Sequence, residues 1–467
     1  MTECPFTPPY PVPLKHKPGL IQRFRIGWSS WVHTLYERAY TMKMGATKLP
    51  RLSIFIVNEK SLVTRVLDDL NREFPKHWLL NDLLEPLIGN AIFVANGAEW
   101  EHQRQMVNPA FIHTNLKRAF PVMIGAAGEL VERMRMRARA AAGAPVDIDP
   151  LMTHVTADII FRTMFSMTLS EAEATKVYDA FSAYQKYAQR STTLGIYGLP
   201  RFGIGRRVRA IGKQVRAAFA PIVAARVAER AAGRHGERKD ILETLLDARH
   251  PVTGAPFAFH ELVDQIAVIF LAGHETTATS LAWTLYLLSE CPEWQDRVLA
   301  EIETVTGGAP VAFEHLKHLE QLRNLFKESL RLYPPVAFLP RMVTKPMVLR
   351  DKQVAAGDMV VAAPWLVHRN PDNWACPHAF DPDRFTRPEG VEAARHAWLP
   401  FGRGPRVCIG AGFAQQEAAV ILAEIIRAFR LSYPDVPKPE LIARLTLRPK
   451  AGIPLLLIER SAASDIS

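Results

Sequence analysis

The chain has 467 residues and a mass of 52.4 kDa, with 48% hydrophobic and 22% charged residues. This composition is that of a globular protein, so it excludes disordered, collagen-like and fibrous classes, and the length allows a large core without disulfide or metal cross-links. The formal net charge is +10, yet no block rich in Lys and Arg and no nucleic-acid module is present, so we expect no nucleic-acid partner.

The N-terminal segment is rich in proline, with six prolines in the first twenty residues. It lacks the apolar core of a signal peptide, and no run of about 18 apolar residues occurs elsewhere. The sequence therefore predicts a cytoplasmic protein without a transmembrane anchor, for which peripheral membrane contact stays open. We expect residues 1–30 to form a lead-in and residues 31–467 to form a single domain.

The order of apolar patterns predicts a mainly α fold with small β-sheets. Leu52–Val57 is a short apolar run that is expected to form a buried strand. Residues 60–331 carry apolar residues at three- and four-residue spacing, which indicates helices. Short strands are predicted between residues 336 and 361, followed by a helix over residues 412–430 and a strand-like tail.

A helix that begins near Ala98 carries Trp100 and Arg104. These residues are one turn apart, so the indole N–H and the guanidinium point the same way. Alone, this pattern is typical of any amphipathic helix.

Residues 201–240 are strongly basic, with eleven Lys or Arg against three Asp or Glu. One interpretation is a solvated helix face, because exposed helices commonly carry such charge. The other is an amphipathic cover that contacts acidic lipid or guides a substrate.

Residues 261–290 form the longest apolar helical pattern, which predicts a helix that runs through the core. Its centre, Ala272-Gly273-His274-Glu275-Thr276-Thr277, breaks local rules, because a mid-helix Gly costs roughly 1 kcal/mol and a buried acid needs partners. Such exceptions often mark function. Thr276 is placed to donate to the carbonyl of Ala272, which loosens the helix and lets water enter. His274 is predicted to be a packing or hydrogen-bonding histidine.

Residues 399–414, LPFGRGPRVCIGAGFA, read as a glycine-rich loop that presents Cys408, followed by a helix. The glycines let the backbone pass close to a flat partner. Backbone N–H groups and Arg406 are expected to favour the thiolate form of Cys408. A redox cysteine or a catalytic nucleophile is the alternative, but the cysteines are scattered without a CxxC pair and no His is adjacent.

The pattern Phe401-x-x-Gly404-x-Arg406-x-Cys408-x-Gly410 resembles the haem-thiolate loop of cytochromes P450. Other segments resemble the same family in the same order, namely residues 100–104, 272–277, 327–331 and 380–385. The resemblance covers about residues 30–460. It implies the cytochrome P450 fold and a non-covalent haem b, with Cys408 as the iron ligand.

The resemblance also assigns roles to individual residues. Phe401 packs against Cys408, and the haem propionates are bound by Trp100, Arg104, Arg341 and Arg406. Ala272 and Gly273 leave room for dioxygen, and Glu275 with Thr276 relays protons. A buried network that supports the Cys408 loop consists of Glu328, Arg331 and Arg384. The residues expected to face the substrate are Leu271, Ala272, Val336, Ala337, Phe338 and Ile453.

The implied activity is that of a monooxygenase, which inserts one atom of O2 into a lipophilic substrate such as a terpenoid, sterol, fatty acyl or aromatic compound. Electrons are expected from a separate ferredoxin and its reductase, attracted by Arg403, Lys117 and Arg118, and the protein is expected to be a monomer. One alternative is a haem-thiolate isomerase or dehydratase, which the Glu275–Thr276 pair argues against. The other is a haem-binding sensor, which a signalling domain would support.

Overall fold

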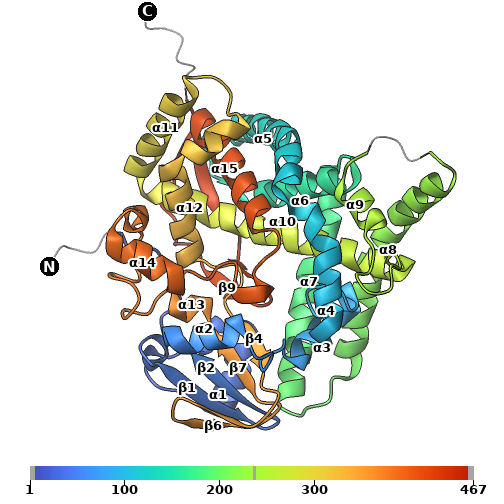
Figure 1. Cartoon of the computed structure of the whole chain (residues 1–467). Helices are drawn as coiled ribbons and strands as arrows, with labels where there is room; N and C mark the ends of the chain where they lie inside the picture. The colour runs from blue at the N-terminus through green and yellow to red at the C-terminus, as the bar shows by residue number, and fades with distance from the viewer. Residues whose placement is uncertain (1–5, 235–237, 461–467) are drawn as a thin grey trace, which may run out of the picture.

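The computed structural model describes residues 6–234 and 238–460. Most of these residues lie in helices, which confirms the predicted mainly α class (Figure 1). In chain order the helices are α1 Leu20–Gly27, α2 Lys60–Asp68, α3 Trp78–Ile88, α4 Gly97–Val107, α5 His113–Ala141, α6 Asp149–Phe165, α7 Glu171–Ile196, α8 Phe202–Ala231, α9 Ile241–Asp247, α10 Phe259–Glu290, α11 Pro292–Thr306, α12 Glu320–Leu332, α13 Pro364–Val367, α14 Pro388–Ala397 and α15 Ala411–Ala428.

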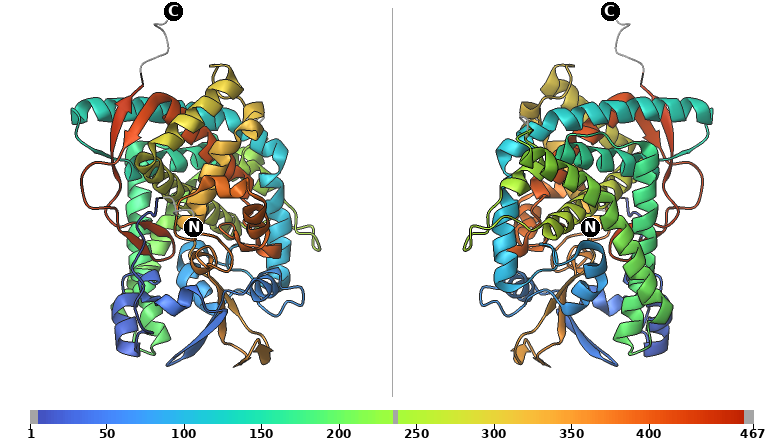
Figure 2. Two further views of the ribbon diagram at one scale, coloured as in Figure 1. Left: turned by 90° about the vertical axis from the view of Figure 1, so that its left-hand side faces the viewer. Right: turned by 90° about the vertical axis from the view of Figure 1, so that its right-hand side faces the viewer.

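The strands form small sheets. They are β1 Met44–Leu49, β2 Leu52–Val57, β3 Val146–Asp147, β4 Leu339–Met342, β5 Met347–Leu349, β6 Lys352–Val354, β7 Met359–Ala362, β8 Phe429–Ser432, β9 Leu441–Ala443, β10 Leu447–Pro449 and β11 Pro454–Glu459. The largest sheet has the order β1-β2-β7-β4, with β2 parallel to β7 and the other pairs antiparallel. In both side views this sheet projects from one end of the helical body (Figure 2).

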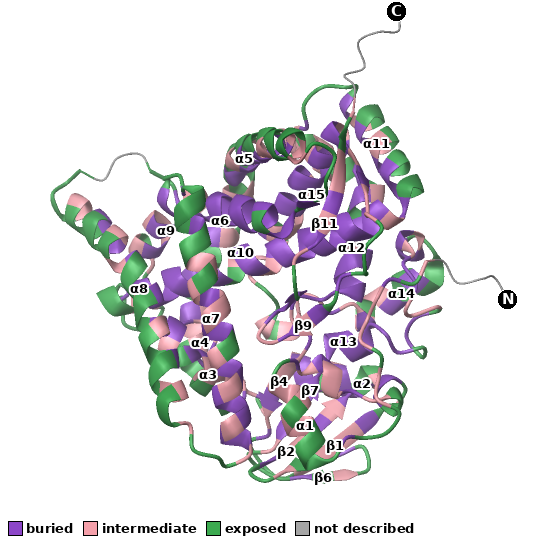
Figure 3. Cartoon of the chain, turned by 180° about the vertical axis from the view of Figure 1, so that it is seen from behind, coloured by how far each residue is buried: buried purple, intermediate pink, exposed green. Residues whose placement is uncertain are grey.

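Helix α10 passes through the core, as the sequence predicts. It packs along α6, and nearly all of its side chains are buried, including Trp283 and Tyr286 (Figure 3). By contrast, α8 carries exposed residues along its outer face, including Arg206 and Arg209, which fits the solvated-face interpretation of the basic segment. No described helix is long and apolar enough to cross a membrane.

The hairpin of β9 and β10 lies between α10 and the β1-β2-β7-β4 sheet (Figures 1 and 3). The Thr279 hydroxyl on α10 donates to the carbonyl of Leu447 in β10 at 2.9 Å. This contact fixes the hairpin turn, residues 444–446, close to the centre of α10.

The N-terminal lead-in packs onto the body. The Tyr333 hydroxyl donates to the Pro9 carbonyl at 2.7 Å, and the Phe380 N–H donates to the Phe6 carbonyl at 2.8 Å. The short helix α1 also forms here, where the sequence pattern gave no helix, since proline density hides its brief apolar spacing.

Candidate active site

Cys408 lies between a 3-10 turn, Gly404–Arg406, and the start of α15. Its N–H donates to the carbonyl of Phe401 at 2.9 Å, which closes the loop. Gly404 has a φ of +70°, and a Cβ at this position would lie 2.5 Å from the Leu67 carbonyl oxygen in α2. A side chain is therefore excluded at Gly404, and the loop packs closely on α2.

Cys408 is surrounded by protein atoms, yet the residue is exposed. Burial raises the pKa of the thiol, against the lowering effects of the Gly410 N–H, Arg104 and Lys76. The Gly410 N–H therefore acts toward the thiolate, as expected of the loop, although burial outweighs it in the protein alone. Arg406 is not among the groups that lower this pKa. A metal ion bound at the sulfur would stabilise the thiolate, since a coordinating thiol is deprotonated.

Two arginines are fixed beside this loop. The Arg104 guanidinium in α4 donates to the carbonyl of Val407 at 2.9 Å. Arg406 lies 3.9 Å from the centre of the Trp100 ring and donates to the Ala95 carbonyl at 2.8 Å. Trp100 and Arg104, one turn apart in α4, thus contact the loop together.

Two more cations complete the group. Lys76 and Arg341 face each other across an isolated β-bridge, and burial lowers the pKa of both, that of Arg341 to about 10. Burial and Arg341 lower the pKa of Arg406 to about 9. Among the described residues, no carboxylate forms an ion pair with any member of this group, Lys76, Arg104, Arg341 and Arg406. Arg341 is buried and the other three are half-buried. Cations withdrawn from water without counterions are costly, so the group is suited to an anion.

Helix α10 presents a small accessible surface at its centre. Ala272 is exposed although its helix is buried, and the Thr276 hydroxyl donates to the Ala272 carbonyl at 2.7 Å, as predicted. Gly273 also has a packing role that the sequence did not indicate, because a Cβ there would lie 3.1 Å from Ile160 Cγ1 in α6. Its small size therefore lets α10 and α6 pack closely at this point.

Glu275 does not hydrogen-bond Thr276. Its Oε1 accepts from Gln185 Nε2 in α7 at 2.5 Å and from the Thr446 hydroxyl at 2.6 Å, whereas its buried Oε2 has no partner among the described residues. Burial raises the pKa of Glu275 to about 7. Next to it, the His274 ring has one hydrogen-bond partner among the described residues, because its Nδ1 donates to the Phe270 carbonyl at 2.9 Å. Burial lowers the pKa of His274 to about 4, in line with a packing histidine.

Comparisons with known proteins identify the family. The family model described as cytochrome P450 matches residues 8–456. The chain belongs to the cytochrome P450 family. The P450 is 34% identical over 386 residues to "Cyclooctat-9-en-7-ol 5-monooxygenase" of Streptomyces melanosporofaciens, covering 81% of this chain and 80% of that protein. It is 31% identical over 445 residues to "Cytokinin hydroxylase" of Arabidopsis thaliana, covering 94% and 84%.

Two further matches agree. "11-oxo-beta-amyrin 30-oxidase" of Glycyrrhiza uralensis is 30% identical over 419 residues, covering 86% of the P450 and 78% of that protein. "Crystal structure of cytochrome P450DA heme domain" superposes with a TM-score of 0.79, 23% identity and coverage of 98% and 99%. The first three are named for hydroxylation or oxidation, and the fourth shows the same fold.

The P450 is therefore a haem enzyme with cysteine-thiolate ligation. Its residues fit haem on two observations. Cys408 and Ala272 are both accessible although they lie inside the body, and the cations around Cys408 lack counterions of their own. Two haem propionates are the counterions that such a group matches. Lys76 was missed from sequence because a lone lysine in a loop carries no spacing signal.

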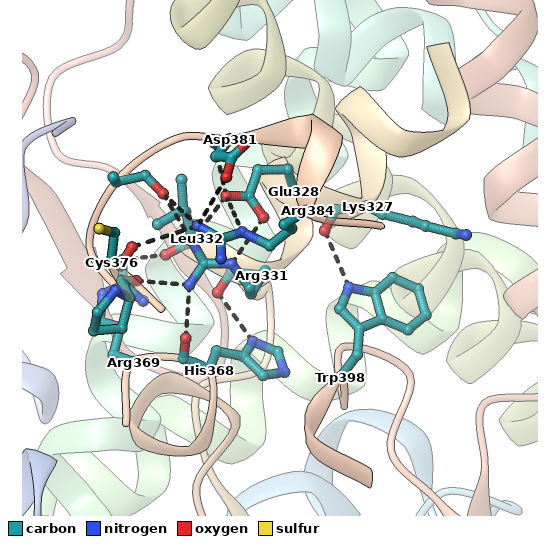
Figure 4. A network of polar contacts seen from close by, with 12 residues as sticks. Lys327, Glu328, Arg331, Leu332, His368, Arg369, Cys376, Asp381, Arg384 and Trp398 are labelled. Atoms are coloured by element: carbon teal, nitrogen blue, oxygen red, sulfur yellow. Dashed lines mark hydrogen bonds and ion pairs between the residues drawn. The ribbon is translucent and has the colours of Figure 1, made fainter. Parts of the chain in front are cut away.

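The predicted network of Glu328, Arg331 and Arg384 is present and wholly buried (Figure 4). Arg331 binds both oxygens of Glu328 at 2.8 Å, and Arg384 Nε binds Oε1 at 3.0 Å. Burial alone would raise the pKa of Glu328, but the two arginines outweigh it and hold the pKa below its usual value. The carboxylate is therefore ionised and satisfied.

His368 links this network to the Cys408 loop. Its Nδ1 donates to the Arg331 carbonyl at 3.0 Å, and its Nε2 accepts the N–H of Leu399 at 2.7 Å. A second link runs from Trp398 Nε1 to the Lys327 carbonyl at 3.0 Å (Figure 4). The accepting Nε2 requires a neutral ring, and burial lowers the pKa of His368 well below its usual value.

The expected substrate-facing residues divide into two groups. Ala272 is exposed, Val336 and Phe338 are partly exposed, and Leu271 and Ala337 are nearly covered. Ile453 is fully buried, and its N–H donates to Asp147 Oδ1 at 2.9 Å beside β3. Ile453 therefore borders no accessible space, and the expectation for it is wrong. The turn after β9, rather than Ile453, lies beside α10. The sequence did not indicate this turn, because its strand pattern is less regular.

Proposed function

We propose that the P450 inserts one atom of O2 into a lipophilic substrate, with haem held by Cys408 and its propionates by Trp100, Arg104, Arg341 and Arg406. Bound haem supplies the oxygen chemistry. The observation that carries the proposal is the accessible Ala272 with its carbonyl bonded to Thr276, in an otherwise buried helix. The substrates named in the relatives differ from one another, so only a lipophilic class is proposed. Residues 31–467 act as one catalytic domain.

Thr276 and Glu275 transfer protons to the site beside Ala272. The Thr276 hydroxyl, by donating to the Ala272 carbonyl, keeps its lone pairs free to accept a proton donor such as water. Glu275 has a pKa raised by burial to about 7, so part of it is protonated at neutral pH. Because the two side chains are not in contact, the proton passes through water or by rotation of Glu275 away from Gln185 and Thr446.

Replacing Thr276 with Ala tests this assignment. Positioned proton transfer contributes about 100-fold or more to rate, so we expect product per NADPH to fall about tenfold or more in Thr276→Ala, with the missing electrons found as hydrogen peroxide. Haem content and substrate affinity should not change. The measurement is the ratio of product and peroxide to NADPH consumed.

Ser280→Ala is the matched control, because the Ser280 hydroxyl makes the same bond one turn further along α10, to the Thr276 carbonyl at 2.7 Å. Its coupling should stay near wild type. Full coupling in Thr276→Ala, or equal loss in both variants, would refute the proton role of Thr276.

We further propose a ferredoxin as electron donor, docked on a groove of about 450 Å³ near the Cys408 side of α15. Its floor includes Phe313 and Leu322, and its rim carries the exposed cations Lys117, Lys317 and Arg323. Among the described residues, Lys117 is the only one of these three cations in an ion pair, with Glu314 at 3.1 Å. Arg403, which we expected to attract the donor, does not line this groove, and it binds Asp68 at 2.8 Å and the Arg395 carbonyl.

The charge of the groove predicts strong salt dependence. Electrostatic steering raises association rates about tenfold or more and fades with ionic strength. In the double variant Lys317→Glu/Arg323→Glu, the KM for ferredoxin should therefore rise about tenfold, with unchanged substrate affinity. The control is Arg206→Glu, on the exposed face of α8. Salt-insensitive reduction together with binding to acidic vesicles would instead assign the basic excess to lipid contact.

A further inference from the structure

Helix α7 and the hairpin of β9 and β10 meet at residues 27–31. Gln189 in α7 donates to the Gly27 carbonyl at 2.7 Å, and the neighbouring Arg190 lies over the Trp28 ring at 5.3 Å. From the other side, the Ala443 carbonyl at the end of β9 accepts the Trp31 N–H at 3.0 Å. These contacts bring Arg190 and the next residue of the hairpin, Arg444, to the same junction.

Neither guanidinium group has an ion-pair partner in the part of the chain that the structure describes. Among the described residues, neither Arg190 nor Arg444 forms an ion pair or donates a side-chain hydrogen bond, although both are half-buried. The Nε of Arg190 is shielded from solvent without an acceptor. Burial and the nearby charge of Arg190 lower the pKa of Arg444, and they outweigh the opposite effect of Glu275. Two like charges held together in a partly dry site favour an anion between them.

This junction is connected to the proposed oxygen site. Arg444 donates its N–H to the Thr446 carbonyl at 3.0 Å within the hairpin turn, and the Thr446 hydroxyl binds Glu275, the neighbour of Thr276. The hairpin turn leads from Arg444 to the centre of α10. A ligand that is bound at Arg444 and lies along this turn therefore passes α10.

We propose that Arg190 and Arg444 bind the carboxylate of the substrate, so that the substrate is a lipophilic carboxylic acid. The proposal rests on the proposed monooxygenase function and specifies its substrate class. A planar guanidinium fork matches a carboxylate in two parallel hydrogen bonds. A doubly charged phosphate fits less well, because the charge of Glu275, which acts on Arg444, repels two negative charges more strongly than one.

The test compares carboxylic acids with their methyl esters, which keep the shape and lose the charge. Dodecanoic, abietic and biphenyl-4-carboxylic acids and their esters are titrated into the haem-loaded protein, and the haem spin state gives each Kd. We expect at least one acid to bind about tenfold more tightly than its ester. Arg190→Gln and Arg444→Gln should each reduce this ratio, the double variant should abolish it, and Arg444→Lys should keep part of it.

Arg206→Gln is the control, because it removes one positive charge from the exposed face of α8. It should keep the acid preference of the wild type. The proposal is overturned if no acid is preferred over its ester, if the preference survives in the double variant, or if the control loses it equally. A normal spectrum of the reduced CO complex in each variant shows that haem and fold are intact, so failure of the anchor is distinguished from failure of the monooxygenase function.

Discussion

Replacing Cys408 with His should abolish the red-shifted Soret band that reduced, CO-bound haem shows when a thiolate is its ligand. Cys408 is exposed although it lies inside the body. Arg104 and Lys76 lie close enough to lower the pKa of its thiol. An imidazole at the same position still binds haem iron but supplies no thiolate charge. The measurement is the absorption difference spectrum of the reduced protein with and without CO.

Cys291→Ala is the matched control for this experiment. Cys291 follows α10 and is buried, and burial raises the pKa of its thiol to about 12, so it is inert. The band should be unchanged in this variant. Loss of the band in Cys291→Ala, or its persistence in Cys408→His, would contradict the ligand assignment.

Glu328→Ala and Arg331→Ala should yield largely haem-free or insoluble protein. Both side chains have no exposed area, and Arg331 also donates to the carbonyls of His368, Pro377 and Ala379. Removing one partner of a buried ion pair costs about 3–5 kcal/mol, a large share of a typical stability of about 5–15 kcal/mol. Thermal unfolding and haem content per chain are the measurements.

An exposed pair of the same residue types provides the control. Glu392 and Arg395 in α14 have the same three-residue spacing and lie 2.9 Å apart, with side chains 58% and 69% exposed. Such a surface pair contributes only about 0–1 kcal/mol, so Glu392→Ala should unfold and bind haem almost as the wild type does. Stable, haem-loaded Glu328→Ala and Arg331→Ala would show that the buried network does not support the loop.

The sequence predicted well the features that depend on residues close together in the chain. The bond from Thr276 to the Ala272 carbonyl depends only on four-residue spacing in one helix, and β2 matches its predicted bounds of Leu52–Val57. The pairing of Glu328 with Arg331 is likewise local. Arg384 joins them across 56 residues, and only the family resemblance indicated that contact.

Contacts between distant segments could not be predicted in this way. The partners of Glu275 come from α7 and from the hairpin turn, at sequence separations of 90 and 171 residues, so no local pattern reveals them. The close approach of Gly273 to Ile160 of α6 likewise joins segments that are far apart in the chain. The sequence indicated Arg403 only as a surface charge, because its ion pair with Asp68 of α2 joins distant segments.

The most direct test of the monooxygenase function is turnover in 18O2 gas with a ferredoxin and its reductase. The substrate is whichever compound shifts the spin state of the haem-loaded protein most strongly, and mass spectrometry of the product gives the label. We expect one 18O atom in each product molecule and one in water. A product without label, or with two labelled atoms, would contradict the assignment of this P450 as a monooxygenase.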